Sequence, residues 1–205
     1  MPAVRPCEPY IRPHPIPNSY WVTTHLLACE YPWDPRNTSS PKIDSLLLAG
    51  VRTFVDLTEA RELSPYAAEL PIRAALLAID MEEIEYHRFP IHDRSLPESV
   101  EYMRVILEVL RDNEERCRTT AVHCWGGIGR TGMVVGCWLV ETGLAKDGVE
   151  ALRIIADEWH GVAKCIRYPQ SPETGPQFDF VLHYHAARAL EQAVGSLVTG
   201  MKVSL

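Results

Sequence analysis

Several features that would define other classes of protein are missing from this sequence of 205 residues. It contains no run close to the roughly 18 consecutive apolar residues that a membrane-spanning helix needs, and its first residues lack the apolar core of a signal peptide. It also lacks an excess of positive charge, because the net charge is −7 and the sequence pI is near 5.6. We therefore expect no membrane span, and neither a nucleic acid nor an anionic membrane as the main partner.

Metal-ligand spacing is missing as well. The sequence has no C-x-x-C pair, and apart from the motifs described below its histidines show no clustered spacing. The cysteines are Cys7, Cys29, Cys117, Cys124, Cys137 and Cys165, and the scattered histidines are His14, His25, His87, His160, His183 and His185. We therefore expect no metal ion, and we expect these histidines to lie on the surface or in the core.

The length of the chain suits one domain of ordinary size with a sizeable core. Residues 1–18 contain six prolines, which remove backbone donors, so we expect an arm that lies extended over the surface. We place the domain itself at residues 19–195 and a C-terminal tail at residues 196–205. The role of the arm and the oligomeric state stay open.

Strand-like and helix-like segments alternate along the domain. This order predicts an α/β fold with a mainly parallel central sheet flanked by helices on both faces. Strands are predicted at residues 19–30 as a hairpin, at 51–58, at 84–89 and in the run that ends at Val122. Helices are predicted at residues 44–49, at 98–111, from Arg130 onward, after a capping box of Asp147 and Glu150, and from near Pro176. Residues 64–82 favour a helix that Pro71 breaks.

The chain is organised around residues 122–132, Val-His-Cys-Trp-Gly-Gly-Ile-Gly-Arg-Thr-Gly. An apolar run typical of a buried strand ends where this segment begins, and a helix that is apolar almost all round begins near Arg130. The glycines between them permit the positive φ angles that a tight concave loop needs. Backbone N–H groups in such a loop, at the positive end of a helix dipole, attract an oxyanion. We therefore predict a phosphate-binding loop formed by Trp125, Gly126, Gly127, Ile128, Gly129 and Arg130.

Cys124 stands at the start of this loop and Arg130 at its end, with five residues between them. A cysteine held among N–H groups at a helix start is stabilised as a thiolate, and a thiolate beside a bound phosphate is a nucleophile. The arginine offers two parallel donors to phosphate oxygens. A sulfur-transfer loop of the rhodanese type also holds a cysteine in an anion cradle, but arginine followed by Thr131 at this spacing favours phosphate.

The residues His123-Cys124, five further residues and Arg130-Thr131 resemble the Cys-x5-Arg-(Ser/Thr) signature of the cysteine-dependent protein tyrosine phosphatase superfamily. The resemblance extends roughly from Ser19 to the final helix and becomes less specific away from Cys124. It implies that His123 supports the loop through hydrogen bonds. It also implies that Thr131 donates a hydrogen bond to the departing thiolate.

The segment Phe89-Pro-Ile-His-Asp93 is similar to the loop that carries the general acid of this superfamily, which implies that role for Asp93. Asp93 also fits as the cap of a helix that begins near Pro97, although Ser95 is the more natural cap residue. The loop lacks the tryptophan of tyrosine-specific members, and the sequence has no counterpart of their phosphotyrosine-recognition loop. Both departures favour the compact dual-specificity branch.

Gln177 fits two roles equally well. It resembles the glutamine of the superfamily that orients the hydrolytic water, with Gln170 as a fallback, and Thr174 three residues before it also forms a capping-box pattern. The strand and turn around Asp56, Glu59 and Glu62 resemble those of dual-specificity members. For Asp56 and Glu59 we expect turn and cap roles.

These residues together predict a phosphatase that needs no cofactor and works through a phosphocysteine on Cys124. A dual-specificity protein phosphatase is favoured, with a pocket shallow enough for phosphoserine, phosphothreonine and phosphotyrosine. A phosphatase of phosphoinositides, sugar phosphates or RNA 5′ ends is the alternative, disfavoured because the loop contains no lysine for a polyanionic head group. A phosphate-binding pseudoenzyme that docks phosphoproteins is the third possibility. Because a reactive thiolate needs a reducing compartment, we expect a cytoplasmic protein.

Overall fold

Five short strands form the central sheet of the computed structural model, which describes residues 12–185. Their spatial order is β1-β2-β5-β3-β4, and every neighbouring pair is parallel except β1 and β2, which form a hairpin. The strands are β1 (Ser19–Trp21), β2 (Leu26–Cys29), β3 (Thr53–Asp56), β4 (Glu85–Arg88) and β5 (Thr120–His123). The predicted mainly parallel sheet and its hairpin are thereby confirmed.

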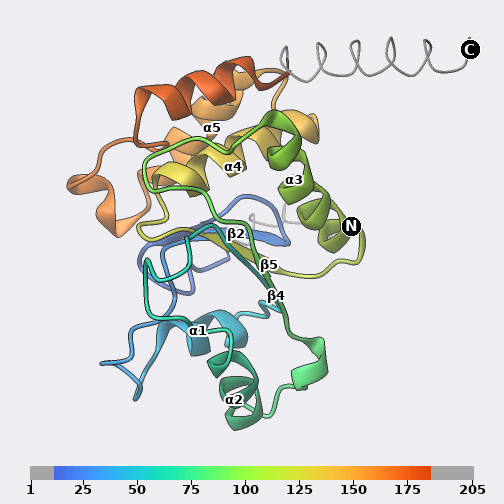
Figure 1. The fold of residues 1–205 in the computed structure, drawn as a ribbon, viewed down its shortest axis with the longest axis vertical. Coiled ribbons are helices and arrows are strands. Elements are labelled where there is room, and N and C mark those ends of the chain that lie inside the picture. Colours follow the sequence, from blue (N-terminus) through green and yellow to red (C-terminus); the bar gives the residue numbers. More distant parts are fainter. Residues whose placement is uncertain (1–11, 186–205) are drawn as a thin grey trace, which may run out of the picture.

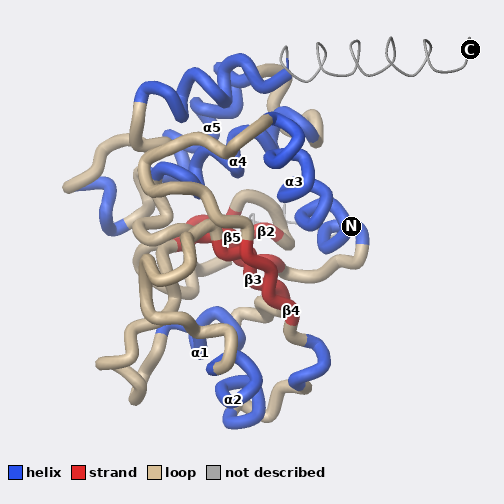
Figure 2. Tube along the Cα trace, in the orientation of Figure 1, coloured by secondary structure: helices blue, strands red, loops and turns tan. Residues whose placement is uncertain are grey.

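Helices cover both faces of this sheet (Figures 1 and 2). The helices are α1 (Lys42–Leu48), α2 (Glu69–Leu76), α3 (Val100–Glu115), α4 (Gly129–Glu141) and α5 (Gly148–Trp159), with the short 3-10 helices η1 (Met81–Glu83) and η2 (Ala163–Ile166). Helices α1 and α2 lie on one face, whereas α3, α4, α5 and the helical residues 175–185 lie on the other. This arrangement agrees with the predicted α/β architecture.

Each face of the sheet has its own hydrophobic core, because successive strand residues point to opposite sides. Leu27, Phe54 and Ala121 join the core under α1 and α2, and Ala28, Val55 and Val122 join the core under α3, α4 and α5. Nearly every residue of α4 is buried. Strand β5 lies between β2 and β3, so the loop that follows it opens at the centre of the sheet edge.

Two local predictions are wrong. Pro71 does not break a helix: it is the third residue of α2, within the first turn, where a missing N–H removes no helical hydrogen bond. The cap of α3 is Ser99, whose side chain accepts a backbone N–H of the first turn, and not Ser95. By contrast, Asp147 caps α5 as predicted, because its side chain accepts the Glu150 N–H, while the Glu150 carboxylate accepts the N–H of Lys146, one residue before the cap.

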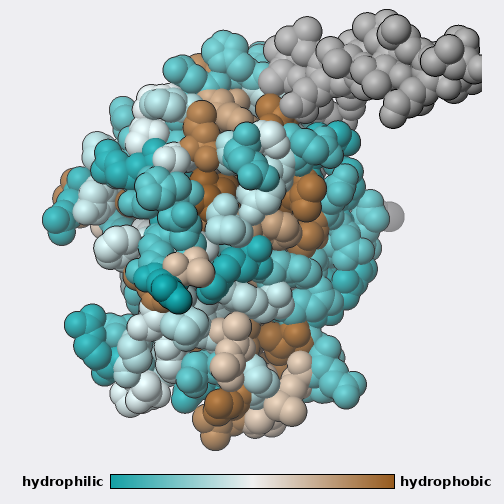
Figure 3. All heavy atoms as spheres, viewed as in Figure 1, coloured by the Kyte–Doolittle hydropathy of each residue, from teal (hydrophilic) through white to brown (hydrophobic). Residues whose placement is uncertain are grey.

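The predicted arm and the end of the predicted domain lie partly outside the described residues, and the tail at 196–205 lies wholly outside them. In the described part of the arm, Ile16 is buried and the Arg12 guanidinium lies 3.7 Å from the centre of the Trp21 ring. No helix among residues 12–185 is long and apolar enough to cross a bilayer. The face drawn in Figure 3 is mainly hydrophilic, and its hydrophobic residues form separate patches.

Candidate active site

The predicted phosphate loop connects the carboxyl end of β5 to the first turn of α4. Three of its carbonyl oxygens accept hydrogen bonds from outside the loop. The acceptor and donor pairs are Trp125 with the Tyr31 N–H (3.0 Å), Gly126 with Lys164 Nζ (3.1 Å) and Ile128 with Ser171 Oγ (2.9 Å). The backbone N–H groups of residues 125–128 donate to no protein group within the described part of the chain. Because the carbonyl groups accept hydrogen bonds from outside the loop and the N–H groups stay free, this loop is suited to bind an oxyanion.

The glycines of the loop serve different purposes. Gly127 alone among them has a positive φ, of 72°, and a Cβ there would lie 2.5 Å from the Cys29 carbonyl oxygen. A Cβ on Gly129 would lie 2.7 Å from Gln177 Oε1, so this glycine permits a close approach. Of the three loop glycines that permit a positive φ angle, only Gly127 therefore adopts one.

Arg130 lies in the first turn of α4, and its side chain is only 1% exposed. Glu62 binds the guanidinium with both oxygens, at 2.6 Å from Nη2 and 2.8 Å from Nη1, and Asp93 Oδ1 lies 2.8 Å from Nη2. Burial acts to lower the pKa of Arg130, but Glu62, Cys124 and Asp93 outweigh it and raise that pKa. The guanidinium is therefore a fixed positive charge at the loop.

Asp93 lies in the loop that follows β4, and its side chain is 48% exposed. Its ion pair with Arg130 places its carboxylate at the phosphate loop, so the structure brings together the predicted acid, the arginine and Cys124. The next residue, Arg94, has a φ of 57° and donates to Glu173 Oε1 at 2.8 Å. That ion pair connects the Asp93 loop to the segment before the last helix.

His123 is fully buried at the end of β5, directly before the loop. Its Nε2 lies 2.5 Å from the Tyr66 hydroxyl and its Nδ1 lies 3.9 Å from Asp56 Oδ1. Burial lowers the pKa of His123, which favours a neutral ring. Burial acts to raise the pKa of Asp56, but His123 and hydrogen bonds from Thr58 and Tyr86 lower it. Asp56 thus has the predicted turn role.

Thr131 and Gln177 are both fully buried beside the loop. The Thr131 hydroxyl has no hydrogen-bond partner within the described residues, so its role towards a thiolate stays a prediction. Gln177 Oε1 accepts from the Thr174 N–H (3.2 Å), and Thr174 Oγ1 accepts from the Gln177 N–H (3.4 Å). This reciprocal pair is the predicted capping box. The side chain also contacts the loop at Gly129, whereas Gln170 is exposed.

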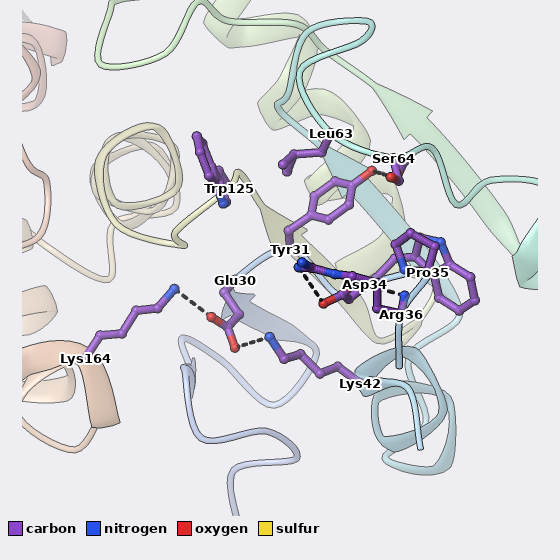
Figure 4. A pocket seen from close by; sticks show the side chains of 11 residues that line it. Glu30, Tyr31, Asp34, Pro35, Arg36, Lys42, Leu63, Ser64, Trp125 and Lys164 are labelled. Atoms are coloured by element: carbon purple, nitrogen blue, oxygen red, sulfur yellow. Dashed lines mark hydrogen bonds and ion pairs between the residues drawn. The ribbon is translucent and has the colours of Figure 1, made fainter. Parts of the chain in front are cut away.

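A cleft of about 520 Å³ borders the loop on the side of β2 and α1 (Figure 4). Trp125, which is 57% exposed, stands at one side of it, and Tyr31 forms part of its wall. Glu30 lies between Lys42 Nζ at 2.7 Å and Lys164 Nζ at 2.6 Å. Burial acts to raise the pKa of Glu30, but the two lysines lower it, so the carboxylate is ionised and holds Lys164 against the loop.

The other described cysteines differ from Cys124 in their surroundings. Cys29 and Cys137 are buried, and burial raises the pKa of both thiols, which makes them poor nucleophiles. Cys117 is exposed and Cys165 is half-buried. Within residues 12–185 no group of three His, Cys, Asp or Glu side chains is placed to hold a metal ion. Among the described cysteines, Cys124 therefore differs by its position at the start of the anion-binding loop.

The sequence did not identify the site roles of three residues: Glu62, predicted only as part of a turn, binds Arg130, Tyr66 contacts His123, and Lys164 donates to the Gly126 carbonyl. Their partners lie 68, 57 and 38 residues away along the chain. One signal was available for the first of them. A buried arginine needs a carboxylate partner, and Glu62 lies in a turn close to the end of a predicted strand.

Comparisons with known proteins agree with this geometry. A family model described as the Swiss Army Knife protein, DSP-PTPase phosphatase domain (PTP-SAK), matches residues 18–181. The chain is 26% identical over 161 residues to protein tyrosine phosphatase domain-containing protein 1 of Mus musculus, and the match covers 73% of this chain and 21% of that protein. The chain thus spans about a fifth of the length of this curated relative.

Two solved structures have a similar fold. Tk-PTP in its active form has a TM-score of 0.62 and 24% identity, with coverage of 81% of this chain and 94% of that one. PTPMT1 in complex with PI(5)P has a TM-score of 0.61 and 16% identity, with coverage of 83% and 98%. At these identities the likeness supports the fold alone. From the family match, the fold and the loop together, the chain belongs to the DSP-PTPase phosphatase domain family, in the compact dual-specificity branch of the cysteine-dependent protein tyrosine phosphatase superfamily.

Proposed function

We propose that this chain hydrolyses phosphomonoesters on proteins, on phosphotyrosine as well as on phosphoserine and phosphothreonine. The observation that carries the proposal is the contact of 2.8 Å between Asp93 Oδ1 and Arg130 Nη2. This contact places the Asp93 carboxylate, from the loop that follows β4, next to the loop that contains Cys124. Nucleophile, anion cradle and acid are then within reach of one bound phosphate.

In the first step the Cys124 thiolate attacks phosphorus, and the bond between phosphorus and the ester oxygen breaks. The bound phosphate takes the place of the Asp93 carboxylate on Arg130, and Asp93 in its protonated form gives its proton to the leaving oxygen, while Arg130 and the loop amides bind the equatorial oxygens. In similar preorganised sites each such donor contributes a factor of about 10² to 10³ in kcat. The step leaves a phosphocysteine and an ionised Asp93.

In the second step water attacks the phosphocysteine. Asp93 takes the proton of the water, the bond between phosphorus and sulfur breaks, and inorganic phosphate and the thiolate are released. The Thr131 hydroxyl, which has no partner in the described part of the chain, is available to donate a hydrogen bond to the departing sulfur. Gln177, which contacts the loop at Gly129, is our candidate for orienting the water. Because the thiolate must stay reduced, we propose that the chain works in the cytoplasm.

A phosphoinositide phosphatase is the second candidate. PTPMT1, one of the similar structures, was crystallised with PI(5)P, and Lys164 supplies at Gly126 the lysine that the loop itself lacks. Against it, Lys164 is already paired with Glu30, and the net charge of −7 disfavours an anionic bilayer. The presence of Cys124, Arg130 and Asp93 disfavours a pseudoenzyme.

A substrate screen tests the proposal. We expect steady turnover of an aryl phosphate, and kcat/KM values on phosphotyrosine and phosphothreonine peptides that exceed those on phosphoinositides and nucleotides. The absence of aryl phosphate turnover would favour the pseudoenzyme. A preference for phosphotyrosine of several thousandfold, about 5 kcal/mol in transition-state binding, would contradict the shallow pocket.

A further inference from the structure

A second cleft, of about 390 Å³, opens beside the phosphate loop on the side of the Asp93 loop and η2. Its charged lining side chains are Asp93, Arg94, Lys164, Arg167 and Glu173, and it shares Trp125 and Lys164 with the cleft of Figure 4. We call it the rim cleft. Both clefts border the phosphate loop. The part of a substrate beyond its bound phosphate therefore lies over one of them.

The cations of the rim cleft differ in whether a carboxylate already binds them. Arg94 donates to Glu173 at 2.8 Å, and Lys164 is paired with Glu30 at 2.6 Å. Arg167 is exposed, and its side chain has no carboxylate or other hydrogen-bond partner within residues 12–185. It is therefore the cation of this cleft that is free to bind an anion from outside.

Arg167 is also held on an ordered backbone. Its segment is fixed at both ends, because the Ala163 N–H donates to the Pro17 carbonyl (3.0 Å) and Trp159 Nε1 donates to the Tyr168 carbonyl (2.7 Å). The guanidinium carbon lies 5.4 Å from the centre of the Tyr168 ring, within the range of a cation–π contact. An arginine stacked in this way loses less conformational freedom when it binds a carboxylate or phosphate.

We infer that Arg167 is a specificity residue that binds an acidic side chain of the peptide substrate, close to the phosphorylated residue. The inference rests on the proposed function, because it needs the phosphate to be bound in the Cys124 loop. An aspartate, a glutamate or a second phosphorylated residue offers the planar or tetrahedral oxyanion that a guanidinium binds through two N–H groups.

The mixed charges of the rim cleft favour a peptide over a membrane surface. Asp93 and Glu173 line the same cleft as the cations, so a lipid head group with several phosphates would face two carboxylates. The chain as a whole also has a net charge of −7, which repels an anionic bilayer. A peptide with one acidic side chain needs only one free cation, and Arg167 supplies it.

Matched phosphopeptides test the inference. Each peptide carries the same phosphotyrosine, with glutamate, glutamine or lysine at the flanking positions, and kcat/KM is measured at low and high salt. We expect the wild-type chain to prefer glutamate over glutamine about threefold to fivefold on one flank, the range that an exposed ion pair supplies. The preference should weaken as the salt concentration rises.

Variants then assign the preference to one residue. Arg167→Ala should bring the ratio of glutamate to glutamine peptides close to one, and Arg167→Glu should make the lysine peptide the better substrate. The matched control is Arg153→Ala on α5, an arginine with a side chain that is 69% exposed and, among residues 12–185, is paired only with Glu150 of the same helix. This control should keep both the turnover and the preference of the wild type.

Three results would overturn the inference: equal rates on all wild-type peptides, a preference that survives in Arg167→Ala, or a requirement for Arg167 only on phosphoinositide vesicles. The last result would assign the residue to a membrane surface. Turnover of an aryl phosphate separates this failure from failure of the proposed function. If the aryl phosphate is hydrolysed and no acidic preference exists, only the inference fails; if neither substrate is hydrolysed, the proposed function fails.

Discussion

The phosphate loop and its rim are built in opposite ways. Cys124 and Arg130 are 3% and 1% exposed, and the loop between them is shaped by backbone hydrogen bonds and by close contacts with Cys29 and Gln177. The rim consists of exposed side chains on the Asp93 loop and on residues 163–168, connected by ion pairs such as that of Arg94. A buried backbone cradle is thus surrounded by a solvated ring of charges.

Because of this difference, the chemistry of such a site depends on the path of its backbone, and its selectivity depends on exposed side chains. Backbone N–H groups are present whatever the side chains are, so the cradle depends on the path of the loop and on the few residues that permit it. Charged rim side chains are replaceable without moving the backbone. We therefore expect loop changes to lower the rate on every substrate and rim changes to alter the choice among substrates.

Asp93 belongs to both groups, since it lies in the rim but takes part in the proposed chemistry. Asp93→Asn should lower kcat about 10²- to 10⁴-fold on phenyl-like phosphates, because the leaving oxygen then receives no proton. The loss should be much smaller when the leaving group is already acidic. A series of aryl phosphates with leaving groups of increasing acidity measures this dependence.

Asp112→Asn is the control for this variant, because Asp112 is an exposed carboxylate on α3 paired with Arg116. It should leave the whole series unchanged. The alkaline limb of the kcat/KM profile should disappear in Asp93→Asn only. Equal losses along the series would assign the acid role to another carboxylate.

Gly127→Ala tests whether the path of the loop controls the rate. An alanine there would need a φ of 72° and would place its Cβ 2.5 Å from the Cys29 carbonyl oxygen, so the loop must shift. A displacement of about 1 Å in such a site lowers the rate about 10²-fold, and we expect this loss of kcat on every substrate. Gly143→Ala is the matched control.

Gly143 has a φ of 75°, but a Cβ there would meet no atom within 4 Å. Its replacement should cost about 1 kcal/mol of unfolding free energy, the price of the left-handed conformation, and leave kcat as in the wild type. If both glycine variants have the same kcat as the wild type, the loop does not need this backbone conformation for catalysis.

Glu62→Gln tests the connection between the buried loop and the rest of the fold. The substitution removes a charged partner from the buried Arg130, so we expect the unfolding free energy to fall by about 2 kcal/mol and kcat/KM to fall about tenfold. Glu59→Gln, in the same turn but paired with His92 on the surface, should change the stability by less than about 0.5 kcal/mol. Denaturant unfolding measures both.

The difference in unfolding free energy between the wild type and Glu62→Gln should depend on pH in a defined direction. Burial acts to raise the pKa of Glu62, but Arg130 and the Glu59 N–H lower it below its ordinary value. A carboxyl group whose pKa is lower in the folded state stabilises the fold when the pH is above its unfolded-state pKa of about 4.3. This stabilisation is lost as the pH falls through the folded-state pKa. The stability gap between the wild type and Glu62→Gln should therefore shrink below about pH 4. A gap that stays constant down to acid unfolding would contradict the ion pair as its cause.

The sequence predicted the parts of the site that are local. The strand, the loop and the start of α4 lie within eleven residues of Val122–Gly132, so their spacing alone indicates an anion site. Contacts between distant segments left no such pattern: Glu62 binds Arg130 across 68 residues, and Lys164 donates to the Gly126 carbonyl across 38. The cap of α3 at Ser99 was missed for a different reason, because Ser95 and Ser99 both lie near the helix start and fit the same rule.

In the proposed mechanism Cys124 carries the phosphoryl group during turnover. Rapid acid quenching of the wild-type chain with a phosphopeptide, followed by mass spectrometry of its peptides, measures this directly. We predict a single phosphate on the peptide that contains Cys124, formed at least as fast as phosphate is released, and none in Cys124→Ser, whose turnover should be lost. Phosphate on a histidine, no covalent phosphate during steady turnover, or undiminished turnover by Cys124→Ser would contradict the account.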